Sequence, residues 1–147
     1  MQKFQNFDGL ISLDCSVFWD MPLFTQIESI IESRVMASWW QYKGLNVIAN
    51  IRWGKPNTYN FAFDGVEQGG TVCVSNAGCS VNKEEIAVFE QGLTEMVKRI
   101  KPSTIIVYGS IKRSIYSKIE VSGIRIVNFP SEASKVQYKK KVLSVSN

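Results

Sequence analysis

The sequence predicts a single α/β domain with an open, mainly parallel five-stranded sheet flanked by helices, either Rossmann-like or a half-barrel. Short β-branched runs alternate with stretches of helical periodicity, and this alternation implies right-handed crossovers between parallel strands. The 147 residues, 45% of them hydrophobic, are enough for one continuous core. Five strands cannot close an eight-stranded barrel, so the sheet is expected to stay open.

Each predicted strand is a short apolar run bounded by turn residues or helix breakers. Asp8-Gly9 precedes the first, Gly69-Gly70 precedes the third, and Pro130 ends the fifth. The fourth, rich in β-branched residues, is typical of a strand buried on both faces. The five strands are expected at residues 10–14, 46–52, 71–75, 104–108 and 124–129.

Three helices are expected between these strands. The first follows Pro22, carries apolar residues at helical spacing and ends near Gly44. The second is the clearest, with a start at Asn82 and Glu85 that resembles a capping box and an end at Pro102. A short third helix is expected over residues 111–121. The apolar positions of the first helix are Leu23, Ile27, Ile30, Ile31 and Val35.

Three features of the chain stay open from sequence alone. Residues 59–66 fit a half-buried strand and a short irregular helix almost equally well. Trp39 and Trp40 cannot face the same way on a helix, so one is expected in the core and the other toward a partner. The domain is expected to span residues 1–130. Residues 131–147 form a basic tail, for which both a helix and a frayed end remain open.

Composition narrows the classes of function. The chain has no histidine, which removes the commonest general base near pH 7 and most zinc sites, and no bound cofactor or metal is expected. Its three cysteines cannot all pair within the chain and form no C-x-x-C motif, which favours free thiols in a reducing cytosol. No run is long enough to cross a bilayer and no signal peptide is recognisable. We therefore expect a cytoplasmic protein.

Polar residues gather where the predicted strands end. In open parallel sheets, ligands bind outside the carboxyl ends of the strands. This rule selects a candidate ligand-binding set of mixed chemistry, which comprises Asp14, Ser16, Asn50, Arg52, Trp53, Ser75, Asn76, Gly78, Tyr108 and Ser110.

This set suits a ligand with a flat base, hydroxyl groups and a phosphate. Arg52 can bind an anion bidentately, Trp53 can stack on a ring, and backbone N–H groups after Gly78 or Gly109 can hold a phosphate. The simpler interpretation is that each loop needs polar turn residues, and no G-x-G-x-x-G or G-x-x-x-x-G-K-[ST] motif is present.

Four residues raise the question of catalysis. Asp14 is the candidate catalytic residue, because a charge that closes a buried strand has to be paired or hydrated. Asp20 is expected to cap the first helix and Asp64 to lie in a turn. Cys79 precedes a helix, where its pKa can be lowered, but a small buried residue is the favoured interpretation.

Five segments form a recognisable set: FDGLISLD at 7–14, Asp20-Met21-Pro22, NIRWG at 50–54, FDGV at 63–66 and IIVYG at 105–109. Together they resemble a bacterial and phage family catalogued as a domain of unknown function, number forty-four seventeen. The resemblance covers residues 7–130, and NIRWG followed by FDG is its most specific part. It implies occurrence on phages and mobile elements, and hence the host-cell cytoplasm, but no established reaction. Members usually carry further residues ahead of the FDG element, so a less covered flank and a homo-oligomer are expected here.

Three functional hypotheses follow. The leading one is a phage-type accessory protein that holds a nucleotide-derived ligand at the strand ends and sequesters a signalling nucleotide of host immunity. The second is a hydrolase or lyase of a nucleotide or phosphoester that uses Asp14 with Arg52, either with or without a metal ion. The third is a protein or nucleic-acid interaction module that uses Trp40 and the basic tail. The net charge of +4 permits nucleic-acid binding without requiring it.

Overall fold

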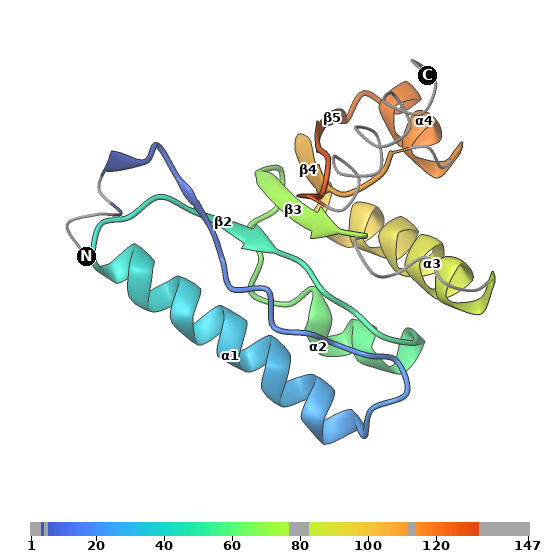
Figure 1. Ribbon diagram of the computed structural model, residues 1–147, viewed down its shortest axis with the longest axis horizontal. Helices are drawn as coiled ribbons and strands as arrows, with labels where there is room; N and C mark the ends of the chain where they lie inside the picture. Colours follow the sequence, from blue (N-terminus) through green and yellow to red (C-terminus); the bar gives the residue numbers. More distant parts are fainter. Residues whose placement is uncertain (1–3, 5, 77–82, 112–113, 133–147) are drawn as a thin grey trace, which may run out of the picture.

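Strands and helices alternate along the whole described part of the chain (Figure 1). The structure is a computed structural model that describes residues 4, 6–76, 83–111 and 114–132. The elements in chain order are β1 (Leu10–Ile11), α1 (Leu23–Tyr42), β2 (Val47–Asn50), the 3-10 turn η2 (Pro56–Thr58), α2 (Tyr59–Ala62), β3 (Thr71–Ser75), α3 (Lys83–Ile100), β4 (Thr104–Tyr108), α4 (Ser114–Val121) and β5 (Arg125–Phe129).

The sheet confirms the predicted fold class and decides between its two forms. Its strand order is β1-β2-β3-β4-β5, and every neighbouring pair is parallel. Because each crossover steps in the same direction and right-handed connections predominate, the helices collect on one face. This is the half-barrel arrangement. A Rossmann-like sheet instead reverses its strand order at a switch point, and no reversal occurs among these five strands.

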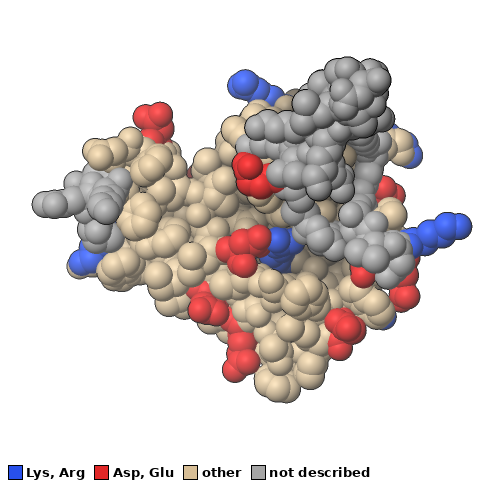
Figure 2. Space-filling view, in the orientation of Figure 1, with Lys and Arg blue, Asp and Glu red and all other residues tan. Residues whose placement is uncertain are grey.

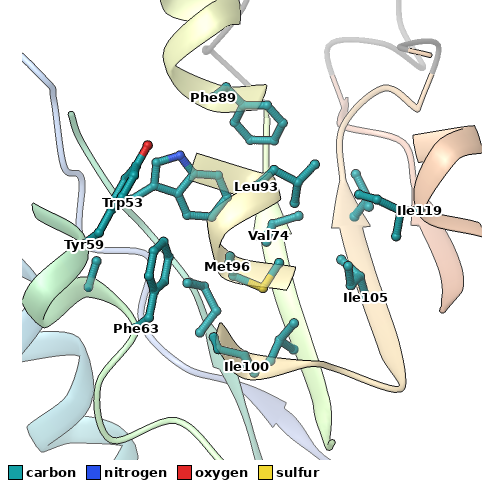
Figure 3. Packing of buried hydrophobic residues seen from close by; sticks show 14 of the residues in the cluster. Trp53, Tyr59, Phe63, Val74, Phe89, Leu93, Met96, Ile100, Ile105 and Ile119 are labelled. Carbon is teal, nitrogen blue, oxygen red and sulfur yellow. The ribbon is translucent and has the colours of Figure 1, made fainter. Parts of the chain in front are cut away.

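The hydrophobic core lies between the sheet and its helices. Val72 and Val74 of β3 and Ile105 and Val107 of β4 are at most 1% exposed and belong to one buried cluster with residues from all four helices. Figure 3 shows α3 filling the centre of this layer. The strand side chains with the opposite parity point to the other face of the sheet, so the register alone separates the core from the open face.

The open face of the sheet carries a groove of about 440 Å³. Its walls are largely apolar and include Cys73 of β3, Ile106 of β4 and Phe129 of β5. Cys73 is buried there, and desolvation raises the pKa of its thiol to about 12. The groove on this face is therefore a largely apolar hollow with few charged side chains.

The buried side of helix α1 differs in part from the side predicted from the sequence. Gln26, Ile30, Ser33 and Ala37 face inward, whereas the predicted apolar positions Leu23, Ile31 and Val35 are exposed. Polar contacts hold the inner side, because Ser33 Oγ donates to Leu13 O at 2.8 Å and the Arg34 guanidinium donates to Ala62 O at 3.1 Å. Hydrogen bonds from these polar side chains to irregular backbone thus add to the apolar packing of Ile30 and Ala37 on this side.

The start of α1 differs from the expected cap. Pro22 occupies the N-cap position and no side chain caps the helix, so the prediction that Asp20 caps α1 is wrong. The backbone N–H groups of Thr25 and Gln26 instead donate to Pro22 O at 3.1 and 3.2 Å, and the Gln26 side chain links the helix to the preceding loop, since its Nε2 donates to Met21 O at 2.7 Å.

Strand β1 is shorter than predicted, with two residues in place of five. The N–H of Ser12 still donates to Ile48 O at 2.9 Å, but the N–H of Asn50 then donates to the Ser12 hydroxyl at 2.9 Å rather than to a β1 carbonyl. A side chain therefore replaces the backbone partner, and the chain leaves the sheet before Asp14.

The aromatic segment left open by the sequence, residues 59–66, begins as the short helix α2 and continues as turn and loop, without a strand. Tyr59 and Phe63 are buried on either side of Ala62, and their rings lie 5.4 Å apart. The Arg99 guanidinium of α3 donates to Tyr59 O at 2.8 Å. No helix in the described ranges is both long and apolar enough to cross a membrane. Almost all of the basic tail, residues 133–147, lies outside the described residues.

Candidate functional site

A cavity of about 500 Å³ lies at the carboxyl ends of β1, β2 and β3. The loop after β1, the loop after β2 and the first turns of α3 form its walls. Five of the residues predicted from sequence line it, namely Asp14, Ser16, Arg52, Trp53 and Ser75. These five residues therefore lie together at the strand ends, as the rule for ligand sites in parallel sheets predicts. They do so although the half-barrel has no switch point in its strand order.

An ion pair between Asp14 and Arg52 dominates the polar side of this cavity. Arg52 Nε donates to Asp14 Oδ1 at 2.5 Å and Arg52 Nη2 donates to Oδ2 at 2.6 Å, which is the bidentate geometry that arginine and carboxylate favour. Arg52 Nη1 also donates to Ser75 O at 3.1 Å. In Figure 2 acidic and basic atoms lie side by side near the middle of this face.

The surroundings of Asp14 keep it ionised near neutral pH. Partial burial raises the pKa of the carboxyl, but the hydrogen bond and charge of Arg52, together with the hydrogen bond from Asn50, outweigh burial and set the pKa below its ordinary value. Asp14 keeps 49% of its side chain exposed, against 20% for Arg52. The carboxylate is therefore a fixed, accessible hydrogen-bond acceptor that is poorly suited to donating a proton.

Asn50 supports the ion pair through a hydrogen bond to Asp14. It is 5% exposed, and its Nδ2 donates to Asp14 Oδ1 at 2.9 Å. Its Oδ1 is buried and finds no donor among the described residues, which is costly for a buried amide. Asn50 lines the groove on the open face rather than the cavity. Its hydrogen bond to Asp14, which lines both, therefore links the groove to the cavity.

Trp53 has a different role from the one its position in the sequence suggested. It is 8% exposed, and its ring centroid lies 5.4 Å from that of Phe89 and 6.0 Å from that of Phe63. Figure 3 shows the indole inside this aromatic cluster. Trp53 forms part of the cavity wall, but its ring is mostly committed to the core, and stacking on a ligand remains a prediction.

Three further residues of the predicted set lie away from Arg52, around the end of β4. Asn76 is 4% exposed and accepts a hydrogen bond from the Ser110 N–H at 3.0 Å. Its Nδ2 donates to Ser110 O at 2.5 Å and to the Tyr116 hydroxyl at 3.1 Å. Asn76 thus ties the loops after β3 and β4 together. Tyr108 is 39% exposed and faces the groove. Gly78 and Cys79 lie outside the described residues.

The aromatic wall of the cavity was missed from sequence. Phe18 and Trp19 enter from the loop after β1, and the Lys55 ammonium lies 4.1 Å from the centroid of the Trp19 ring. The reasoning from strand ends selected mainly polar residues there. Phe18-Trp19, four residues beyond the end of a predicted strand, is the signal that could have identified them.

Acidic side chains outnumber basic ones in this cavity. Asp14, Asp20 and Glu85 line it, and among the described residues Arg52 is the only basic side chain in the lining. Because Arg52 is already paired with Asp14, the walls carry a net negative charge. A polyphosphate inside the cavity would be repelled, whereas an uncharged or cationic group would not. The described residues contain no cluster of three His, Cys, Asp or Glu side chains able to hold a metal ion.

Comparison with known proteins agrees with the sequence motifs. A family model described as Domain of unknown function (DUF4417) matches residues 1–130. The chain belongs to this family. Two curated relatives, each named Gene 1 protein, come from Mycobacterium phage L5 and Mycobacterium phage D29. Both are 30% identical over 112 residues, or 76% of this chain, which correspond to 49% of the L5 protein and 42% of the D29 protein.

The DUF4417 chain spans about half the length of these curated relatives, and no solved structure matches it. The resemblance to a family found on phages is thus confirmed. Within this DUF4417 chain, FDGLISLD ends in Asp14 and NIRWG contains Asn50 and Arg52. These two segments meet in the ion pair at the cavity.

Proposed function

We propose that the protein binds a nucleotide-derived small molecule in the cavity at the ends of β1, β2 and β3. The observation that carries the proposal is one cavity in which the Asp14–Arg52 ion pair faces an aromatic wall. At about 500 Å³, its size falls within the ordinary range for small-molecule sites. A flat apolar ring and a hydrogen-bonding edge on the same ligand would use both walls.

The charges of the cavity indicate how such a ligand lies. The exposed Asp14 carboxylate already accepts three hydrogen bonds from Arg52 and Asn50, which leaves about one acceptor position for a sugar hydroxyl. Phe18 and Trp19 offer rings for stacking. Because the lining is acidic, the base and the ribose belong inside and any phosphate belongs outside it, near the Lys55 ammonium, which lies 4.1 Å from the centroid of the Trp19 ring. A nucleoside should therefore bind at least as tightly as its triphosphate.

Binding without turnover is the form of the proposal that fits the site best. The chain has no histidine, and Arg52 holds the Asp14 carboxyl ionised, which leaves it unsuited to general-acid catalysis. A protein that holds a ligand without converting it acts by lowering the free concentration of that ligand. Together with the phage relatives, this supports a role in sequestering a host signalling nucleotide.

The proposal is tested first by mass spectrometry of small molecules released from the purified protein. Calorimetry then compares nucleosides with mono-, di-, tri- and cyclic nucleotides and with ADP-ribose derivatives. Asp14→Asn and Trp19→Ala should each weaken binding by at least about 10-fold, a loss of about 1.4 kcal/mol. Gln91→Ala, on the exposed side of α3, is the matched control and should bind as the wild type does.

Two outcomes would overturn this function. If no compound is released and none binds at concentrations up to about 1 mM, the cavity is not a site for this class. If the protein converts a bound compound into product, and Asp14→Asn abolishes conversion while binding is retained, the protein is an enzyme. In the second case the cavity keeps its ligand class, but the sequestration role fails.

A further inference from the structure

The solvent side of α1 carries five large apolar side chains, here named the α1 stripe. Phe24, Ile31, Val35, Trp39 and Tyr42 are exposed to 66, 54, 59, 44 and 82%. At 3.6 residues per turn they fall within a sector of about 80°, opposite the buried side of the helix. A surface helix ordinarily turns polar residues to this side.

Helix α1 therefore carries apolar side chains on both its buried and its exposed sides. Two polar side chains, Gln26 and Ser33, are buried against the domain, while the α1 stripe faces outward. Figure 1 shows α1 at the edge of the molecule, and no other described element covers its outer side. A contiguous apolar surface of this kind marks a contact site for another macromolecule.

The extent of the α1 stripe approaches what a stable protein interface requires. Large apolar and aromatic side chains present about 150–250 Å² each, so the exposed fractions correspond to about 600 Å² per protomer. Standard interfaces bury about 800 Å² per partner. Exposed polar residues beside and within the sector of the stripe, among them Ser38 and Glu28, make up the remainder.

The spacing of the α1 stripe identifies the partner. We propose that the stripe is the contact surface of a homodimer, in which α1 packs antiparallel against α1 of a second copy about a two-fold axis at the level of residue 33. A two-fold interface must be self-complementary. Phe24 and Tyr42 each lie nine positions from residue 33, and Ile31 and Val35 each lie two. Phe24 then meets the partner's Tyr42, and Ile31 meets the partner's Val35.

The charges on α1 favour the antiparallel orientation over the parallel one. Glu28 is the charged residue within the stripe sector, five positions from the axis, so the two copies of Glu28 lie about 15 Å apart along the helix. That separation exceeds the screening length of about 8 Å at physiological salt. A parallel pair would place the two carboxylates side by side. Glu32 lies at the flank beside Cys15, and the Arg34 guanidinium points inward to Ala62 O.

Sedimentation equilibrium over about 1–100 µM tests the dimer, because this range covers interfaces of modest affinity. The wild-type chain should show twice its mass of 16.6 kDa at the upper concentrations. Val35→Glu buries two unpaired charges near the axis and should raise the dissociation constant at least about 100-fold. Gln91→Glu, with the same charge change on exposed α3, should dimerise as the wild type does.

A wild-type chain that stays monomeric throughout, or a Val35→Glu chain that dimerises unchanged, overturns the proposal. Equal weakening by Gln91→Glu also overturns it, because the effect would then follow charge rather than position. Circular dichroism checks that each variant folds, and Ile31→Glu replaces Val35→Glu if it does not. The orientation has its own test: a mixture of Ile31→Cys and Val35→Cys chains should form the mixed disulfide, whereas Phe24→Cys with Ile31→Cys should not.

The dimer does not depend on the proposed ligand, since the α1 stripe lines neither hollow at the strand ends. Ligand binding and dimerisation are measured separately, and either can fail alone.

Discussion

Replacing Gly92 with alanine should destabilise the protein, although alanine is the better helix former. Gly92 lies inside α3, where the exchange would normally stabilise by about 1 kcal/mol. Here a Cβ would lie 2.0 Å from Trp53 Nε1 and 2.1 Å from Trp53 Cδ1. Ordinary contacts between heavy atoms begin near 3.5 Å, so either the helix or the indole has to move by more than 1 Å.

The size of the effect follows from how firmly the indole is held. Trp53 is 8% exposed and packs between Phe63 and Phe89, so a shift of the ring disturbs both neighbours. Overpacking of a core costs about 1–3 kcal/mol, and the rigidity of both partners places this site at the upper end. Allowing for the gain in helix propensity, we expect a net loss of about 2 kcal/mol. For a chain of this length that corresponds to a fall in Tm of about 4–8 °C.

Urea unfolding followed by circular dichroism measures this loss. The neighbouring Gln91→Ala, on the exposed side of α3, should change stability by less than about 0.5 kcal/mol. In a Trp53→Leu background the clash disappears, so Gly92→Ala should become neutral or stabilising, and the two changes should be non-additive. A Gly92→Ala protein as stable as the wild type would refute the packing of the Trp53 indole against α3.

Two further substitutions and one alkylation reaction test the strand ends and the groove on the open face. Asn76→Ala should cost about 1–3 kcal/mol of unfolding free energy, because it removes the three hydrogen bonds that the buried Asn76 side chain makes with Ser110 and Tyr116; a loss below about 0.5 kcal/mol in urea unfolding would contradict the loop tie. Asp14→Asn should cost about 1 kcal/mol at pH 7, discounted for exposure. Because the pKa of Asp14 is lowered in the folded state, this difference from the wild type should disappear as pH falls below the ordinary aspartate range near 4; a gap that persists at pH 2 would argue against the ion pair. Cys73, whose thiol pKa is about 12, should alkylate at pH 8 at least about 100-fold more slowly in the folded protein than in urea, as peptide mapping by mass spectrometry can show.

The fold could be predicted from local patterns because each strand is a continuous apolar run. Thr71–Ser75 and Thr104–Tyr108 are strands with the expected bounds, since both lie in the middle of the sheet and are buried. The length of the first strand was overestimated. The Ser12 hydroxyl accepts the hydrogen bond from the Asn50 N–H, and a pattern of apolar residues cannot reveal such a side-chain acceptor. The choice between half-barrel and Rossmann-like order depends on which strands pair, which no local periodicity encodes.

The site could be predicted only in part, for a related reason. Asp14 and Arg52 each follow a strand, and parallel strands end at one edge, so their meeting follows from topology. Trp53 and Asn76 also follow strands, yet their side chains point into the domain. The direction of a side chain just past a strand depends on how the backbone turns there, and the sequence does not state it. The same limit hid the apolar outer side of α1, because Ile31 and Val35 fit a buried stripe equally well.

The consecutive strand order has a consequence for how one wall of the cavity is held. No later strand lies between two earlier ones, so the pairing of β3, β4 and β5 is complete without β1. The two-residue β1 therefore contributes little to the register of the rest of the sheet. The loop beyond β1 is held mainly by side chains, through the Asp14–Arg52 ion pair and the hydrogen bonds that Asn50 and Ser33 donate to Asp14 and Leu13. The contacts that position this wall of the cavity are thus separate from the backbone hydrogen bonds that hold the sheet together.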